Sequence, residues 1–126
     1  MKSKYLKKRT KEFAHRCVKV AVLLPRSYLG NHVQAQLIKC GTSVAANYRA
    51  ACIAQTKAGF ISKLSIVIEE TDESCFWLEF IVDEKLLNKK HVESLLDEAK
   101  QLKAIFISSR KTAQKNKKLS INNYQS

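Results

Sequence analysis

The chain has 126 residues, three glycines and one proline, and a formal net charge of +12. The length suits a single domain, and so few glycines and prolines exclude a turn-rich all-β fold and favour long helices. No apolar run approaches the roughly 18 residues that a bilayer span needs, and no secretory signal is visible. The four cysteines form no CxxC pair, which is typical of buried free thiols in a reducing compartment. We therefore expect a cytoplasmic protein that is not associated with a membrane.

The charge is unevenly distributed along the chain. Glu12 is the only acidic residue before position 69, and residues 99–126 contain none, so the remaining acids all fall in residues 69–98. A surplus of Lys and Arg of this kind attracts phosphate polyanions. The alternative is that the basic ends only keep the protein soluble.

The first two predicted helices lie on either side of the proline. The first runs from about Lys4 to Leu24 and is stopped by Pro25. The second starts with Asn31 as its N-cap and frays near residues 53–55. In both, apolar or small residues recur every three or four positions on one face. The predicted core positions are Leu6, Thr10, Phe13, Cys17, Val20 and Leu24, followed by Val33, Leu37, Gly41, Val44, Tyr48 and Ala51.

The third helix is predicted from about Lys57 to Leu87, and the fourth begins after residues 88–90 with Asn88 as its cap. Four helices with short links predict an all-α, antiparallel up-down-up-down four-helix bundle over residues 1–113. Residues 114–126 are polar and basic, and we expect them to form a flexible tail. The predicted core positions of these helices are Phe60, Leu64, Val67, Thr71, Cys75, Leu78 and Val82, then Val92, Leu95, Ala99, Leu102, Phe106 and Ser109.

A second apolar strip on the third helix cannot be covered by the same small bundle. Such a strip favours contact with another subunit or a protein partner. The strip comprises Ile61, Ile68, Phe76, Phe80 and Ile81, and the candidate interface residues are Phe76, Trp77, Phe80 and Arg49.

The basic residues fall near both ends of the chain. In an up-down-up-down bundle, the start of the first helix and the end of the fourth share a pole, so the two groups converge there. A concentrated positive pole suits contacts with nucleic-acid phosphates, whose strength falls with salt. Only Tyr5 and Tyr124 are aromatic near it, so base stacking has little support. The candidate binding residues are Lys4, Lys7, Lys8, Arg9, Lys11, Arg110, Lys111, Lys115, Lys117 and Lys118.

The stretch 40-CGTSVAANYRAA-51 is unusually rich in small residues. It predicts a place where a neighbouring helix packs very closely, because a glycine inside a helix costs about 1 kcal/mol relative to alanine. Ser43 and Asn47 share a face, and a buried Asn47 needs hydrogen-bond partners. We expect a polar clasp in which Asn47 bonds to Glu70 or Thr71 of the third helix. Arg49 is then left to face a subunit boundary or an anion.

Catalytic and metal sites find little support in the sequence. A di-metal bundle needs Glu-x-x-His on two helices, and the chain has one such motif, 12-EFAH-15. The acidic run 69-EETDE-73 is interpreted as a solvated face, although Glu70 lies beside a core position. Neither a P-loop nor a dinucleotide-binding glycine pattern is present. We predict a protein that is not an enzyme and that holds no cofactor or metal.

Several segments, in order, match the signature of one protein family. The match covers about residues 10–112, in five elements: 42-TSV-44, 47-NYRAA-51, 60-FISKLSI-66, 69-EETDES-74 and 77-WLE-79. With this ordered set the chain resembles the bacterial four helix bundle proteins, also called 23S ribosomal RNA intervening-sequence proteins.

The resemblance implies a four-helix bundle assembled as a ring-shaped homopentamer without catalytic activity. Some members of the family are encoded within intervening sequences of 23S ribosomal RNA genes. A related group are accessory proteins of diversity-generating retroelements that bind nucleic acid and reverse transcriptase. The leading hypothesis is a basic, oligomeric protein that binds nucleic acid, RNA in particular. The alternative is a scaffold or accessory subunit for a protein such as a reverse transcriptase.

Overall fold

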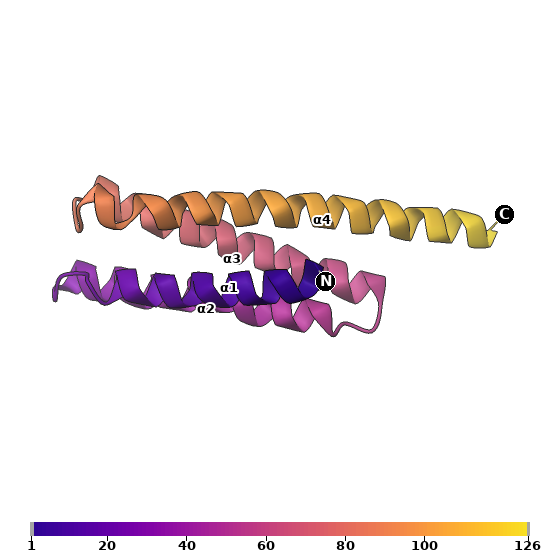
Figure 1. The fold of residues 1–126 in the computed structure, drawn as a ribbon, viewed down its shortest axis with the longest axis horizontal. Coiled ribbons are helices and arrows are strands. Elements are labelled where there is room, and N and C mark those ends of the chain that lie inside the picture. The colour runs from indigo at the N-terminus through magenta and orange to yellow at the C-terminus, as the bar shows by residue number, and fades with distance from the viewer. Residues whose placement is uncertain (1, 126) are drawn as a thin grey trace.

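The computed structural model describes the backbone of residues 2–125 and the side chains of residues 2–120. Its long helices are α1 (Lys2–Ala21), α2 (Tyr28–Cys52), α3 (Lys57–Asp83) and α4 (Glu93–Gln125). Consecutive helices run antiparallel (Figure 1). Each packs along its neighbour in sequence, whereas α1 and α4 meet more sparsely. This arrangement confirms the predicted all-α, up-and-down four-helix bundle. None of the described helices has the length and apolar character that crossing a membrane requires.

The start of α2 corrects one prediction. The helix begins at Tyr28, one turn before the position predicted from Asn31, because the Ser27 side chain serves as the N-cap and accepts a hydrogen bond from the Gly30 amide at 2.9 Å. A side chain at Gly30 would collide with the carbonyl oxygen of Pro25. The glycine therefore allows the chain to turn tightly from the proline into the helix.

Two helices also end earlier than predicted. α1 stops at Ala21 instead of Leu24, which fits the bias of residues before a proline against helical geometry. α3 stops at Asp83 instead of Leu87, and Lys85 adopts a positive φ of 55° in the turn that follows. Asn88 does act as a cap, but for a short 3₁₀ helix, Lys89–His91, that precedes α4.

The predicted core is largely confirmed. Every predicted position of α1 and α2 is buried, while Phe60, Val82 and Ser109 are half-buried. The expected second apolar strip was partly wrong. Ile68 and Ile81 are buried inside this bundle and are not available to a partner. Tyr48 of α2 packs on Phe106 of α4 with ring centroids 5.3 Å apart, which joins these two helices within the core.

The α1–α2 seam contains the close approach that the small residues predicted. A Cβ atom added at Gly41 would lie 2.6 Å from both Cβ and Sγ of Cys17 on α1. Real Cβ atoms do not come so near, so these two helices touch at the bare backbone of Gly41. Only glycine fits at this position.

The end of α4 differs from the expected loose tail. The helix continues through residues 114–125 and projects past the other helices in Figure 1. Side chains from residue 114 to residue 120 are exposed, apart from the half-buried Lys117. Lys and Gln favour helix as isolated residues, so the polar composition that suggested a tail is also compatible with a solvated helix.

Candidate nucleic-acid interface

One pole of the bundle gathers segments that carry no negative charge. The start of α1, the link between α2 and α3, and the second half of α4 lie toward the same end of the molecule (Figure 1). No acidic residue occurs in residues 1–11, 41–68 or 99–126, which supply these segments. We call this end the basic pole. Its field is of one sign, and such a surface attracts polyanions from a distance.

Most of the predicted cationic side chains are free at this pole. Seven are exposed and one, Lys117, is half-buried. None of these eight takes part in an ion pair among the described side chains. The seven exposed residues are Lys4, Lys7, Lys8, Lys11, Lys111, Lys115 and Lys118.

Of the two predicted arginines, Arg9 is held in an ion pair and is not a free cation, whereas Arg110 only hydrogen-bonds to a hydroxyl and stays a predicted phosphate contact. Arg9 donates from Nε and Nη2 to the two carboxylate oxygens of Glu98 at 2.8 and 2.7 Å, and Nη2 also reaches Gln101 at 3.0 Å. The hydrogen bond to the Glu98 carboxylate raises the pKa of Arg9 above its ordinary value. Arg110 donates to the Ser65 hydroxyl at 3.3 Å. Arg9 therefore fastens α1 to α4, and Arg110 fastens α4 to α3.

A groove runs between α1 and α2 on the outside of the bundle. Its volume is about 680 Å³, and small residues such as Ala45 and Ala46 line its floor. Arg49, whose role the sequence left open, lines the groove opposite the lysines of α1. We call this feature the α1–α2 groove; its lining residues that bear or can bear positive charge are Lys7, Lys8, Lys11, His15 and Arg49.

The expected polar clasp takes a different form. The Asn47 amide donates to the carbonyl and the hydroxyl oxygen of Ser43 at 3.0 and 2.8 Å, within α2 itself. Thr71 likewise donates back to Val67 of its own helix at 2.6 Å. The predicted bond from Asn47 to Glu70 or Thr71 was wrong, because the preceding turn of each helix already satisfies these side chains.

The buried polar contact between α2 and α3 lies elsewhere. The Ser74 hydroxyl lies 3.3 Å from Cys40 Sγ and donates to the Glu70 carbonyl oxygen at 2.9 Å. Glu70 is half-buried. Its removal from water, together with the neighbouring Glu73, raises the pKa of its carboxyl. A serine paired with a cysteine leaves no periodic signal in the sequence, so pattern reasoning could not find this contact.

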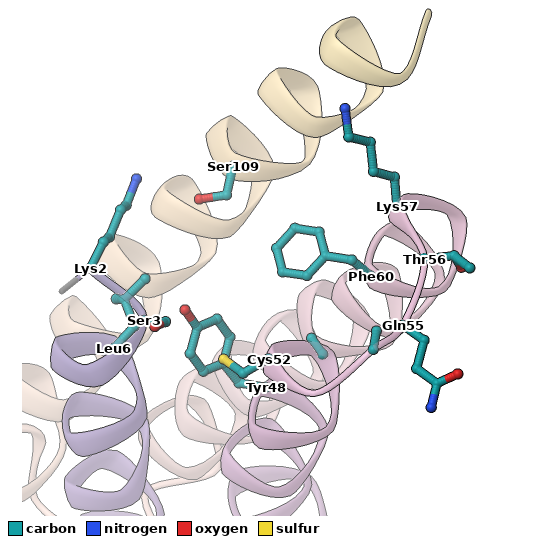
Figure 2. A pocket seen from close by; sticks show the side chains of 12 residues that line it. Lys2, Ser3, Leu6, Tyr48, Cys52, Gln55, Thr56, Lys57, Phe60 and Ser109 are labelled. Atoms are coloured by element: carbon teal, nitrogen blue, oxygen red, sulfur yellow. The ribbon is translucent and has the colours of Figure 1, made fainter. Parts of the chain in front are cut away.

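A second hollow opens at the basic pole and is shown in Figure 2. Its volume is about 510 Å³, within the range of small-ligand sites. Leu6, Tyr48 and Phe60 give it an apolar lining, while Lys2 and Lys57 lie at its edges. We call it the end pocket. The sequence placed Tyr48 and Phe60 in the core stripe, and only the ends of three helices meeting here reveal them as pocket residues.

An aromatic and acidic surface lies on the outer side of α3. Phe76 is 53% exposed, and its ring stacks on that of Phe80 with centroids 5.9 Å apart. Trp77 packs edge-on against both rings, and its buried Nε1 has no hydrogen-bond partner among the described residues. We call this the α3 outer surface; a hollow of about 330 Å³ on it is lined by Asp72, Phe76, Glu79, Phe80 and Asp83.

Metal-binding and thiol chemistry do not define a site here. In the described part of the chain, no three His, Cys, Asp or Glu side chains are grouped so as to hold a metal ion. The four cysteines are free. Burial raises the pKa of Cys17 and Cys40, the latter to about 11, so these thiols stay protonated near neutral pH.

Comparison with known proteins agrees with the sequence and the fold. The family model described as "23S rRNA-intervening sequence protein" matches residues 4–108. A crystal structure from Bacteroides thetaiotaomicron, described as a protein of unknown function from the S23 ribosomal protein family, superposes with a TM-score of 0.80 at 32% sequence identity. The superposition covers 88% of this chain and 99% of the other. No curated protein matches. The chain belongs to the 23S rRNA-intervening sequence protein family.

Proposed function

We propose that this protein binds nucleic acid, RNA in particular, through the basic pole and the adjoining α1–α2 groove, and that it acts by binding without catalysis. The observation that carries the proposal is the tertiary convergence of exposed, unpaired lysines from both ends of the chain on one acid-free pole. The description of the family, which names an intervening sequence of ribosomal RNA, supports RNA as the nucleic acid.

The groove offers a specific way to hold a sugar-phosphate backbone. Lys8 and Lys11 extend from α1 and Arg49 from α2, so cations approach from both walls. Ala45 and Ala46 leave room between the walls for the backbone itself. Each phosphate neutralised in this way releases counterions, which makes affinity fall linearly with salt on a logarithmic scale. Contacts to phosphate position the strand but carry no sequence information.

The test is a salt series of binding measurements on the double variant Lys8→Gln/Lys11→Gln. Fluorescence anisotropy with a labelled RNA of about 20 nucleotides gives the dissociation constant at each salt concentration. Loss of two phosphate contacts should reduce the slope of log affinity against log salt by about 1.4, from roughly 0.7 per contact on single strands. At low salt the affinity should fall about tenfold.

A matched control carries the same loss of charge at the other pole. Lys89 and Lys90 are exposed on the 3₁₀ helix, and Lys89→Gln/Lys90→Gln should retain the wild-type slope. Equal losses in both variants would mean that net charge alone drives binding, which contradicts an interface at the groove. If the wild-type protein does not bind RNA even at low salt, the proposal as a whole is wrong.

We further propose that the protein associates with copies of itself, with the α3 outer surface as one contact face. The exposed ring of Phe76, stacked on the half-buried Phe80, favours this second role. Asp72, Glu79 and Asp83 accompany the aromatic centre of this surface, so a basic face of the next copy outside the α1–α2 groove would complement it in charge. Because such a face differs from the α3 outer surface, the pairing would be head-to-tail, which closes into a ring where the rotation allows.

The substitution Phe76→Ser tests this association. Light scattering coupled to size-exclusion chromatography should show an assembly for the wild-type protein and a smaller mass for the variant. The exposed Tyr28→Ser, at the start of α2, is the control and should leave the mass unchanged. A monomeric wild-type protein would refute self-association. A mass change in Lys8→Gln/Lys11→Gln would assign the groove to assembly instead of RNA.

A further inference from the structure

We infer that the end pocket receives an unpaired nucleobase, so that the protein distinguishes single-stranded from fully paired nucleic acid. The inference rests on the proposed nucleic-acid binding and adds a ligand class and a site to it. The pocket lies within the basic pole itself, between the start of α1, the α2–α3 link, the start of α3 and α4 (Figure 2). A strand held by the surrounding lysines would pass over its opening.

The lining of the pocket suits a flat aromatic ligand. Phe60 is half-buried, and Figure 2 shows its ring directed into the gap between α3 and α4. Tyr48 and Leu6 close the floor from α2 and α1. Stacking of a base on an aromatic side chain does not depend on which base it is, because every base has a π face. The apolar floor would shield the other faces of the base from water.

Polar groups around the edge of the pocket match the rest of a nucleotide. The hydroxyls of Ser3 and Ser109 lie on its lining, within reach of base edges or a 2′-hydroxyl. Lys2 is exposed and takes part in no ion pair among the described residues. Lys57 donates to the Ser120 hydroxyl at 3.1 Å, an exposed contact that a phosphate can replace. The volume of about 510 Å³ also has room for a nucleotide.

Paired nucleic acid cannot use such a pocket without breaking its own structure. Extruding a base from a duplex costs a few kcal/mol in stacking and pairing, whereas this cost is smallest for a base that is already unpaired. Recognition of RNA by proteins therefore concentrates on loops, bulges and single strands whose bases can splay out. The end pocket should add affinity for these targets, while the lysines of the basic pole act on single and double strands alike.

The test uses a single-stranded RNA of about 12 nucleotides that contains one 2-aminopurine, whose fluorescence is quenched on stacking. The variant is Phe60→Leu, which keeps an apolar side chain against the core but removes the aromatic face. The wild-type protein should quench the probe, and Phe60→Leu should lose most of the quenching. The variant should also bind the single strand about tenfold more weakly, the equivalent of one stacked base, with unchanged affinity for a duplex. A DNA strand of the same sequence shows whether the 2′-hydroxyl contributes.

Controls separate the pocket from the general charge of the pole. Tyr28→Leu removes an exposed aromatic residue outside the pocket and should quench like the wild type. Ser109→Leu fills part of the pocket from α4 with a non-aromatic side chain and leaves Phe60 intact. It should reproduce the loss, which keeps the test decisive if Phe60→Leu does not fold. Salt-dependent binding without quenching, or equal quenching by wild type and both pocket variants, would overturn the inference and leave the proposed function standing. An absence of all binding at low salt would remove both.

Discussion

Gly41 shows how a single residue sets the distance between two helices. An ordinary mid-helix glycine gains about 1 kcal/mol of stability when replaced by alanine. Here the new Cβ would meet Cys17 of α1 at 2.6 Å, in a place where Gly41 is buried and Cys17 is fully buried. Overpacking of this kind typically costs 1–3 kcal/mol. The cost of overpacking exceeds the gain in helix propensity. Replacing Gly41 by alanine should therefore destabilise the protein, where an ordinary glycine-to-alanine change in a helix stabilises it.

We expect Gly41→Ala to lower the free energy of unfolding, by up to about 2 kcal/mol, the difference between these two terms. Urea denaturation followed by circular dichroism measures it. Ala35→Gly, at an exposed position of the same helix outside the α1–α2 groove, provides the reference, since it changes helix propensity without altering that seam. A Gly41→Ala protein more stable than wild type would show that α1 and α2 have room to separate.

At the scale of elements, α4 is divided by what it contacts. Its first half carries the buried Leu95-to-Phe106 stripe and packs on α3, as the three-and-four spacing predicted. Its second half extends past the bundle with lysines and few apolar contacts. Periodicity could not assign this half, because a helix without a buried face has no hydrophobic period to detect. The same helix thus serves the core at one end and the basic pole at the other.

Removal of residues 114–126 should separate these two roles. We expect the free energy of unfolding to stay within about 0.5 kcal/mol of wild type, as for surface changes in general. The slope of RNA affinity against salt should fall by about 2, since Lys115, Lys117 and Lys118 are lost at roughly 0.7 each. Chemical denaturation and the anisotropy series are the measurements. A large loss of stability would mean that the projecting half supports the fold, and an unchanged slope would exclude its lysines from phosphate contact.

In the whole molecule, the seam between α1 and α4 depends on a few polar contacts. Arg9 joins Glu98 and Gln101 across 89 and 92 positions of the sequence, and Arg16 donates to Ser94 at 2.9 Å. The other seams between long helices are packed more continuously. Arg9 and Glu98 side chains are only 18% and 17% exposed, so their paired hydrogen bonds are partly shielded from water and worth more than a surface pair.

Arg9→Gln should therefore lower the free energy of unfolding by about 1–2 kcal/mol. Hydrogen exchange should become faster in the first half of α1, because this substitution loosens the α1–α4 seam. The neighbouring Lys8→Gln is the matched control, since Lys8 is exposed and should leave stability unchanged while weakening RNA binding. The reverse result, with Arg9→Gln affecting RNA binding alone, would return Arg9 to the set of free cations.

The sequence by itself determined the helices, nearly all of the core and the separation of acidic from basic segments along the chain. These follow from local chemistry: the helical repeat places every third or fourth residue on one face, and a proline or cap ends the element. The acid-free segments were also readable, and the antiparallel order of the helices was enough to bring them to one pole.

Only the tertiary structure decided what individual polar and aromatic side chains do. The sequence predicted Arg9 as a phosphate contact, but in the structure it is hydrogen-bonded to Glu98. Asn47 bonds within its own helix, and Tyr48 and Phe60 line a pocket. Whether a side chain is free or engaged depends on atoms supplied by segments far away in the sequence. No local pattern records those distances, so the helices and the basic pole of this protein were predictable from its sequence, whereas the α1–α2 groove, the end pocket and the pairing of Arg9 were not.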